Sequence, residues 1–227
     1  MDHLTTLELK YMINAKNRII GFTQIVKKQS KLAVIATSML VAGSISASAN
    51  NETAQKIADH FASVKTMMGE FVQLSPDGNQ VAGKFFISRP GKLRFNYEKP
   101  SAVRVISDGK NLAVGNQKLK TWSLYPLRTT PLKLLLSDKI DLSSKTVKSV
   151  TEDENLTTIV MGNKSVFGKS TITMMFDPKS YELRQWTIKD AQGKDTTVMI
   201  FNIETGVDFA RSVFRVPYES ARKNKNG

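Results

Sequence analysis

The stretch ISRPGKLRFNYEKP, residues 87–100, predicts the end of one β-strand, a tight turn and a second strand. In the second strand Leu93, Phe95 and Tyr97 alternate with charged or amide side chains, so the two kinds point to opposite faces. This alternation is typical of an antiparallel sheet with one buried face. Arg89 stands beside the turn proline, next to the apolar face. The sequence therefore raises the question of what a cation does there.

Short strand patterns continue along the chain, spaced about 8–12 residues apart, as in a meandering antiparallel sheet. Turn sequences such as SPDGN, DGK, DPKSY and DAQGKD separate them. The expected strands cover 70–74, 81–88, 93–98, 102–107, 111–114, 119–124, 145–153, 156–162, 170–177, 181–190 and 196–204, with 212–217 as a candidate last strand and 219–227 as a basic tail.

Two helices are expected. Residues 51–69 place apolar side chains at helical spacing, from Ala54 to Val64, with Gly69 as the stop. Thr130 and Pro131 suit the start of a short, very apolar helix that ends near Leu136. The predicted fold class is α+β, mostly β.

The N-terminal part of the chain has the features of a secretory signal peptide. Residues 27–49 contain three lysines, an apolar run of 11 residues from Leu32 to Ala42, and a small-x-small site at 47–49. We expect cleavage after Ala49 and a single domain over residues 50–227. Because signal peptides begin close to their basic region, we expect residues 1–26 to reflect a start assigned too early, with Val26 as the start.

The composition excludes several classes of chemistry. The chain has no cysteine, so a thiol nucleophile and a disulfide framework are both excluded. His60 is the one histidine after residue 49, and we expect it at the surface, without a metal or cofactor. Three carboxylates at 152–154 are expected to form a solvated turn. A secreted hydrolase that uses a carboxylate pair stays open, because no pattern selects a pair.

The charge of the chain is strongly basic. After residue 49 there are 27 basic and 18 acidic residues, and the lysines are spread along the strands. We expect no nucleic-acid partner, because a nucleic-acid site gathers its basic residues on one surface. An anionic membrane surface or an acidic protein matches this charge better.

An ordered set of motifs resembles the periplasmic lipoprotein-carrier family LolA. The set comprises an F-x-Q strand at 71–73, a G-x-F-x-I-x-R-P strand at 83–90, an aromatic strand ending at Pro100, an I-S-D-G-K turn at 106–110 and a T-P-apolar helix at 130–136. The resemblance extends over nearly all of residues 51–217. It implies an incomplete antiparallel β-barrel, or half-barrel, with helices forming a lid over the concave face.

The resemblance also implies a function without catalysis or a cofactor. The cavity would take acyl chains of lipoproteins from an inner-membrane ABC exporter, and the protein would cross the periplasm, as a monomer, to an outer-membrane acceptor or the outer membrane. Arg89 would be the latch that holds the lid closed. The resemblance and the apolar pattern together predict a lining of Leu93, Phe95, Ile106, Trp122, Pro131, Leu134 and Leu135.

Two further expectations accompany this interpretation. Met174, Met175 and Met199 would suit an adaptable cavity lining, although ordinary core packing explains them as well. The alternative function is a periplasmic lipid- or glycolipid-binding or sensing protein of the same fold. The aromatic position that the family often has three residues after the proline is Leu93 here, which leaves the shape of the cavity open.

Overall fold

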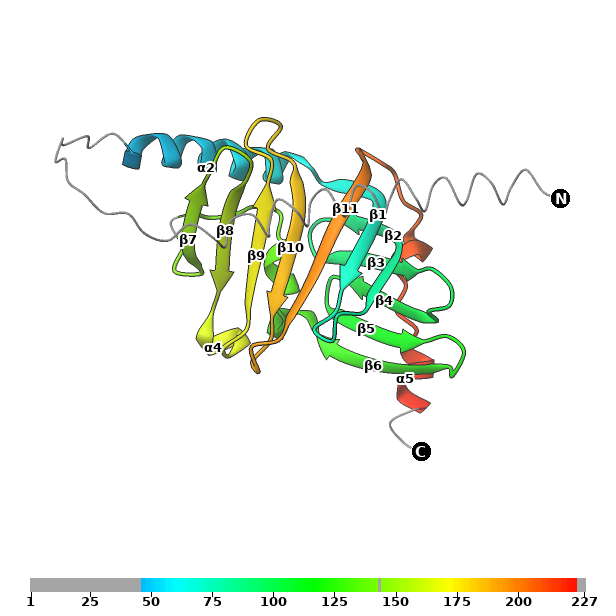
Figure 1. Ribbon diagram of the computed structural model, residues 1–227. Helices are drawn as coiled ribbons and strands as arrows, with labels where there is room; N and C mark the ends of the chain where they lie inside the picture. The colour runs from blue at the N-terminus through cyan, green and yellow to red at the C-terminus, as the bar shows by residue number, and fades with distance from the viewer. Residues whose placement is uncertain (1–45, 143, 224–227) are drawn as a thin grey trace. The chain divides into compact units, whose positions relative to one another are not determined.

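A computed structural model describes residues 46–142 and 144–223, with side chains from 52 onward and up to 222. Eleven strands form one antiparallel sheet in the order β6-β5-β4-β3-β2-β1-β11-β10-β9-β8-β7 (Figure 1). The strands are β1 (Thr66–Leu74), β2 (Gln80–Ser88), β3 (Lys92–Tyr97), β4 (Val103–Asp108), β5 (Asn111–Asn116), β6 (Thr121–Pro126), β7 (Val147–Glu152), β8 (Thr157–Gly162), β9 (Thr171–Phe176), β10 (Leu183–Lys189) and β11 (Asp195–Thr205).

The sheet is open, because β6 and β7 form its two edges and do not pair with each other. In Figure 1, β5 and β6 cross the direction of β7–β10 at a steep angle, so the sheet is strongly curved. The predicted incomplete antiparallel barrel is thus confirmed as one open sheet. The strand order has a simple origin: β1 to β6 are sequential neighbours on one side of the sheet, and β7 to β11 are sequential neighbours on the other. The two halves are joined where β1 pairs with β11.

Helices α2 (Ser46–Ser63) and α3 (Leu132–Leu135) are the two expected helices, and the 3-10 helix η1 (Leu127–Thr129) precedes α3. The expected helix end at Gly69 is wrong, because α2 ends at Ser63 and Gly69 lies within β1. A Cβ at Gly69 would lie 2.6 Å from the Phe201 carbonyl oxygen. The glycine therefore permits a close approach of β11 at a bulge rather than ending a helix.

The C-terminal segment also differs from expectation. Residues 212–217 are not a strand: η2 (Arg211–Phe214) is a 3-10 helix, and α5 (Tyr218–Lys223) begins the part expected to be a loose tail. Side chains on the sheet hold this segment, since Arg94 Nη1 donates to the Val213 carbonyl at 3.0 Å and Asn111 Nδ2 donates to the Tyr218 hydroxyl at 2.8 Å. The C-terminal segment is thus held by side-chain hydrogen bonds, and not by the backbone hydrogen bonds to a neighbouring strand that a β-strand would make.

A further helix, α4 (Lys164–Phe167), connects β8 to β9 and is capped by the Asn163 side chain. None of the helices in the described part of the chain is long and apolar enough to cross a membrane. The expected signal peptide and the start at Val26 lie outside the described side chains. The described residues form one compact unit.

Candidate functional site

One face of the curved sheet is apolar and is covered by α2, η1 and α3, which we call the cover. Ile57 and Phe61 of α2 and Leu135 of α3 pack in the same buried cluster as the strand residues beneath them. The strand members of this cluster are Met67, Phe71, Phe85, Ile87, Leu93, Phe95, Ile159, Met161, Ile172, Met174, Phe176, Leu183, Trp186, Val198 and Ile200. The sheet face is therefore shielded from water by the apolar side chains of the cover.

Arg89 joins α2 and α3 of the cover. Its Nη1 donates to the Val64 carbonyl, just beyond the end of α2, at 2.8 Å, and its Nε donates to the Leu135 carbonyl in α3 at 3.3 Å. Helix ends leave carbonyls without intrahelical donors, and the fork of a guanidinium can satisfy two of them at once. One side chain on the β2–β3 turn thus contacts both of these parts of the cover.

The guanidinium of Arg89 is buried, with 6% of the residue exposed. Burial lowers the pKa of Arg89 to about 10, because desolvation disfavours its charged form. Its carbon Cζ lies 4.0 Å from the centre of the Phe61 ring, so Arg89 makes a cation–π contact with a residue of α2. Nη2 is buried and has no hydrogen-bond partner, so this cation is held by two neutral carbonyls and one ring.

The turn after Arg89 is fixed by backbone contacts. The Arg89 N–H donates to the Lys65 carbonyl at 2.7 Å, and the Gly91 N–H donates to the Leu136 carbonyl at 2.8 Å. The Ser107 hydroxyl donates to the Gly91 carbonyl at 2.7 Å and is fully buried. The cover is therefore attached to the sheet by main-chain bonds on either side of Arg89.

The predicted lining residues fall into two groups. Leu93, Phe95 and Leu135 are buried in the cluster under the cover, and Leu134 packs against it while half-buried. Pro131 is half-buried at the start of α3.

Ile106 and Trp122 do not join the cluster under the cover. They pack in a separate cluster with Ala113, Val216 and Tyr218. Ile106 lies opposite Arg94 in the sheet register, whereas Phe95 lies opposite Val105. Because side chains alternate between faces, Ile106 is on the face opposite to Phe95. The expected single lining is therefore divided between the two faces of the sheet.

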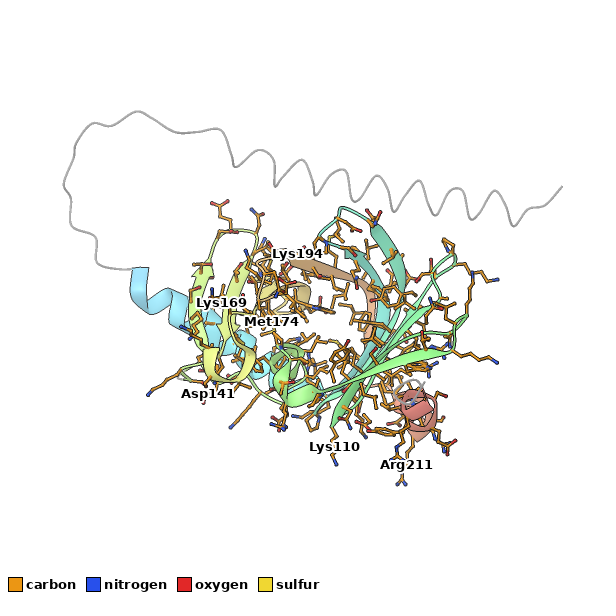
Figure 2. The ribbon with its side chains drawn as sticks, turned by 90° about the horizontal axis from the view of Figure 1, so that it is seen from below. Lys110, Asp141, Lys169, Met174, Lys194 and Arg211 are labelled. Carbon is orange, nitrogen blue, oxygen red and sulfur yellow. The ribbon has the colours of Figure 1, made fainter. Side chains whose placement is uncertain are left out.

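The methionines are divided in the same way. Met174 is fully buried and pairs with Trp186 in the register, under the cover. Met174 is labelled in Figure 2, and its strand β9 contacts helix α3 of the cover. Met175 and Met199 both pair with Gln185 on the other face. Met174 alone of the three belongs to the buried cluster under the cover.

The aromatic centre of this site was predicted only in part, because the predicted lining contained Phe95 but neither Phe71 nor Trp186. Phe95 stacks on Trp186 with the ring centres 6.1 Å apart, and the Phe71 ring lies 4.6 Å from that of Phe95 at a tilt of 37°. Phe71 also meets Tyr97 edge to face, and the Tyr97 hydroxyl donates to Gln73 Oε1 at 2.7 Å. The burial of Tyr97 raises its pKa to about 12. The alternation in the expected strands 70–74 and 181–190 was the available signal for Phe71 and Trp186.

A small pocket lies beside Arg89. It is lined by His60, Phe61, Val64, Met67, Arg89, Phe176, Tyr181, Glu182, Leu183, Ile203 and Thr205, and its volume is about 80 Å³. An apolar cavity of about 150 Å³ holds benzene, so this pocket is too small for a long acyl chain. With the cover closed, its own side chains occupy the apolar face.

The described residues contain no cluster of three histidine, cysteine or carboxylate side chains suited to a metal. His60, expected at the surface, is half-buried and lines the pocket with Glu182. The solvated turn expected at 152–154 is only partly present, because Glu152 ends β7 and its Oε2 is buried without a hydrogen-bond partner. Asp153 lies in the turn and accepts from the Asn155 and Leu156 N–H groups, which is an ordinary turn contact.

The sequence of this chain matches a known protein family and several of its members. A family model described as outer membrane lipoprotein carrier protein LolA matches residues 62–217. An outer-membrane lipoprotein carrier protein of Chromohalobacter salexigens is 28% identical over 200 residues, covering 82% of this chain and 92% of its own. Another, of Methylobacillus flagellatus, is 23% identical over 197 residues, covering 82% and 94%.

Solved structures with low sequence identity were also found. An uncharacterized conserved protein of Thermus thermophilus aligns at a TM-score of 0.45 and 10% identity, covering 74% of this chain and 97% of its own. A LolA superfamily protein of Nitrosomonas europaea aligns at a TM-score of 0.41 and 7% identity, covering 73% and 98%.

Proposed function

Because the chain belongs to the outer-membrane lipoprotein carrier family LolA, we propose that it is a non-enzymatic periplasmic carrier for the acyl chains of lipoproteins. In this proposal it receives its cargo from an inner-membrane ABC exporter and delivers it to an acceptor in the outer membrane. The relatives named above are lipoprotein carriers by name, and their low identity leaves cargo and partners of this chain to experiment.

The observation that carries the proposal is the position of Arg89 between α2 and α3 of the cover. The apolar face beneath the cover is the kind of surface that an acyl chain needs. Each buried methylene contributes about 0.8 kcal/mol, so a sixteen-carbon chain exposed to water corresponds to roughly 12 kcal/mol. A lipoprotein with such chains requires a shielded surface to cross an aqueous compartment.

Exchange of the cover for cargo is the proposed mechanism. The cover would move away when acyl chains enter, and Arg89 would lose its bonds to the Val64 and Leu135 carbonyls. The buried Leu93, Phe95 and Leu135, together with Leu134 and Pro131 at the edge, would then contact the chains. Closing of the cover restores the Arg89 bonds and so favours release.

The test is to co-express the protein with a tagged lipoprotein and to isolate soluble complexes from the periplasm. We expect a soluble complex whose bound acyl groups are identified by mass spectrometry. We expect Arg89→Leu to retain more lipoprotein, because its closed state no longer competes with the cargo. Arg184→Leu is the matched control, since Arg184 makes exposed ion pairs with Asp177 and Glu182.

Two results would contradict the proposal. If the purified protein carried free phospholipid and no lipoprotein, the alternative of a periplasmic lipid-binding or sensing protein would replace the carrier. If Arg89→Leu released cargo as readily as Arg184→Leu, the latch role of Arg89 would be wrong.

A further inference from the structure

The turn between β5 and β6 carries the most exposed large apolar side chain of the described residues. Leu119 is 70% exposed, compared with 37–48% for the other exposed large apolar residues. Isolated exposed apolar residues are common and need no explanation by themselves. Leu119 differs because of what holds it and what surrounds it.

The backbone of this turn is fixed. The side-chain oxygen of Asn116 accepts from the Lys118 N–H at 3.0 Å and from the Leu119 N–H at 3.1 Å. The Gln117 N–H donates to the Ala102 carbonyl at 2.9 Å, which attaches the turn to the loop between β3 and β4. Leu119 is therefore presented on a preorganised turn, which lowers the entropy cost of inserting it elsewhere.

Positive charge surrounds Leu119. Its neighbours Lys118 and Lys120 are both exposed, and the adjoining loop adds the exposed Lys99 against one acid, Glu98. The apolar members of the same surface are Pro100 and Val103, and Val103 lies opposite Asn116 in the sheet register. We call Lys99, Pro100, Val103, Lys118, Leu119 and Lys120 the tip surface.

We propose that the tip surface contacts the anionic phospholipid surface of a membrane. A protruding leucine between two lysines can enter the acyl boundary, while the lysine stems lie along it and their ammonium groups stay at the phosphates. Each lysine near an anionic leaflet adds electrostatic attraction. Two short turns offer too little area for a stable protein interface, which usually buries about 800 Å² on each partner.

The geometry gives the contact a direction. β3 begins beside the Arg89 turn and ends at Tyr97, next to the loop that carries Lys99. Six strand residues span roughly 20 Å, so the tip surface lies at the far end of β3 from Arg89. Lys110, labelled in Figure 2, marks the opposite end of β5 from the tip surface. This inference does not depend on which cargo the protein carries.

Vesicle sedimentation tests the proposal, with all variants sharing the same N-terminus so that the apolar run at 32–42 contributes equally. We expect binding to vesicles of phosphatidylcholine mixed with phosphatidylglycerol, weak binding to phosphatidylcholine alone, and loss of binding as salt rises. Leu119→Ser should lower the partition coefficient about tenfold. Lys118→Glu with Lys120→Glu should lower it by about 20-fold or more.

Matched controls separate the tip surface from general adhesion. Val166→Ser removes another exposed apolar side chain, on α4, and Lys148→Glu reverses a charge on β7, the opposite edge of the sheet. Both should bind like the parent. Brominated lipids should quench Trp122, which is half-buried near the tip surface, and Trp122→Phe should abolish that quenching because Trp186 is buried.

Equal binding to neutral and anionic vesicles, or an unchanged partition coefficient for Leu119→Ser, would overturn the proposal. The proposal would also be wrong if the parent bound no vesicles but could be cross-linked to an acidic protein, and the tip variants lost that cross-link. The tip surface would then be a protein-docking site. Thermal unfolding of each variant verifies that the fold is retained.

Discussion

At the scale of single residues, Arg89 is placed where a cation is least expected. A buried guanidinium is costly unless it is paired and hydrogen-bonded, and Arg89 has one buried nitrogen without a partner. An apolar residue would pack under the cover without this cost. Perturbed, incompletely satisfied charges concentrate at functional sites, which is why we propose that Arg89 serves opening and closing rather than stability.

Arg89→Lys should loosen the cover while leaving the charge in place. A lysine ammonium cannot reproduce the fork that donates to the Val64 and Leu135 carbonyls together. We expect amide hydrogen exchange in α2 to rise about tenfold, as for a loss of about 1.4 kcal/mol. Mass spectrometry of the α2 peptide measures this. Arg184→Lys is the exposed control, and equal exchange in both variants would contradict the prediction.

Gly91→Ala should destabilise the turn that supports Arg89. Gly91 has φ +80°, and an added Cβ would lie 2.7 Å from Gly109 Cα, a backbone atom that cannot move aside. Strain and overpacking together predict a loss of about 3 kcal/mol in the free energy of unfolding. Gly78→Ala has a similar φ of +82° with nothing within 4 Å, so it should lose only about 1 kcal/mol. Urea unfolding of both variants decides, and equal losses would show that the contact with Gly109 is unimportant.

At the scale of elements, the strands were predictable because side chains alternate with a period of two. The stretch 93–98 predicted β3 to within a residue or two, and the turn sequences predicted the hairpins. The end of α2 and the fate of 212–217 were not predictable, because both depend on distant partners. Gly69 meets β11, and Tyr218 is held by Asp108 and Asn111 from strands far away in the sequence.

The docking of α5 should weaken in acid. Burial raises the pKa of Asp108, but hydrogen bonds from the Asn111 and Lys110 N–H groups and the Tyr218 hydroxyl outweigh it, and the pKa lies below the ordinary value of an aspartate. A depressed carboxyl pKa stabilises the fold above the unfolded pKa, and this contribution disappears as pH falls through the folded value. Asp108→Asn should therefore be less stable than the parent near neutrality, with the difference shrinking below about pH 4.

Tyr218→Phe refines this prediction. It removes one of the bonds that lower the pKa of Asp108, so acid destabilisation should begin at a higher pH than in the parent. Chemical unfolding at a series of pH values measures all three proteins. A parent and an Asp108→Asn variant with parallel pH profiles would show that Asp108 does not couple α5 to the sheet.

At the scale of the whole described unit, sequence periodicity identified an apolar sheet but not which apolar face lies under the cover. In β4 both faces carry apolar side chains, Val105 on one and Ile106 on the other. The two faces differ in what covers them: η2 and α5 are attached to the face that carries Ile106. Ile106 and Trp122 therefore belong with the C-terminal segment, and Leu93 and Phe95 with the cover.

This division predicts which parts move when an acylated ligand binds. The strands under the cover form a continuous ladder with a stacked aromatic centre, whereas the cover is held by packing and by a few bonds around Arg89. A triacylated lipopeptide should therefore speed amide exchange in α2 and α3 while β9 and β10 stay protected. The same peptide without acyl chains is the control and should change neither region. Slower exchange in α2 on binding would mean that the cover clamps its ligand, and the exchange of cover for cargo would then be wrong.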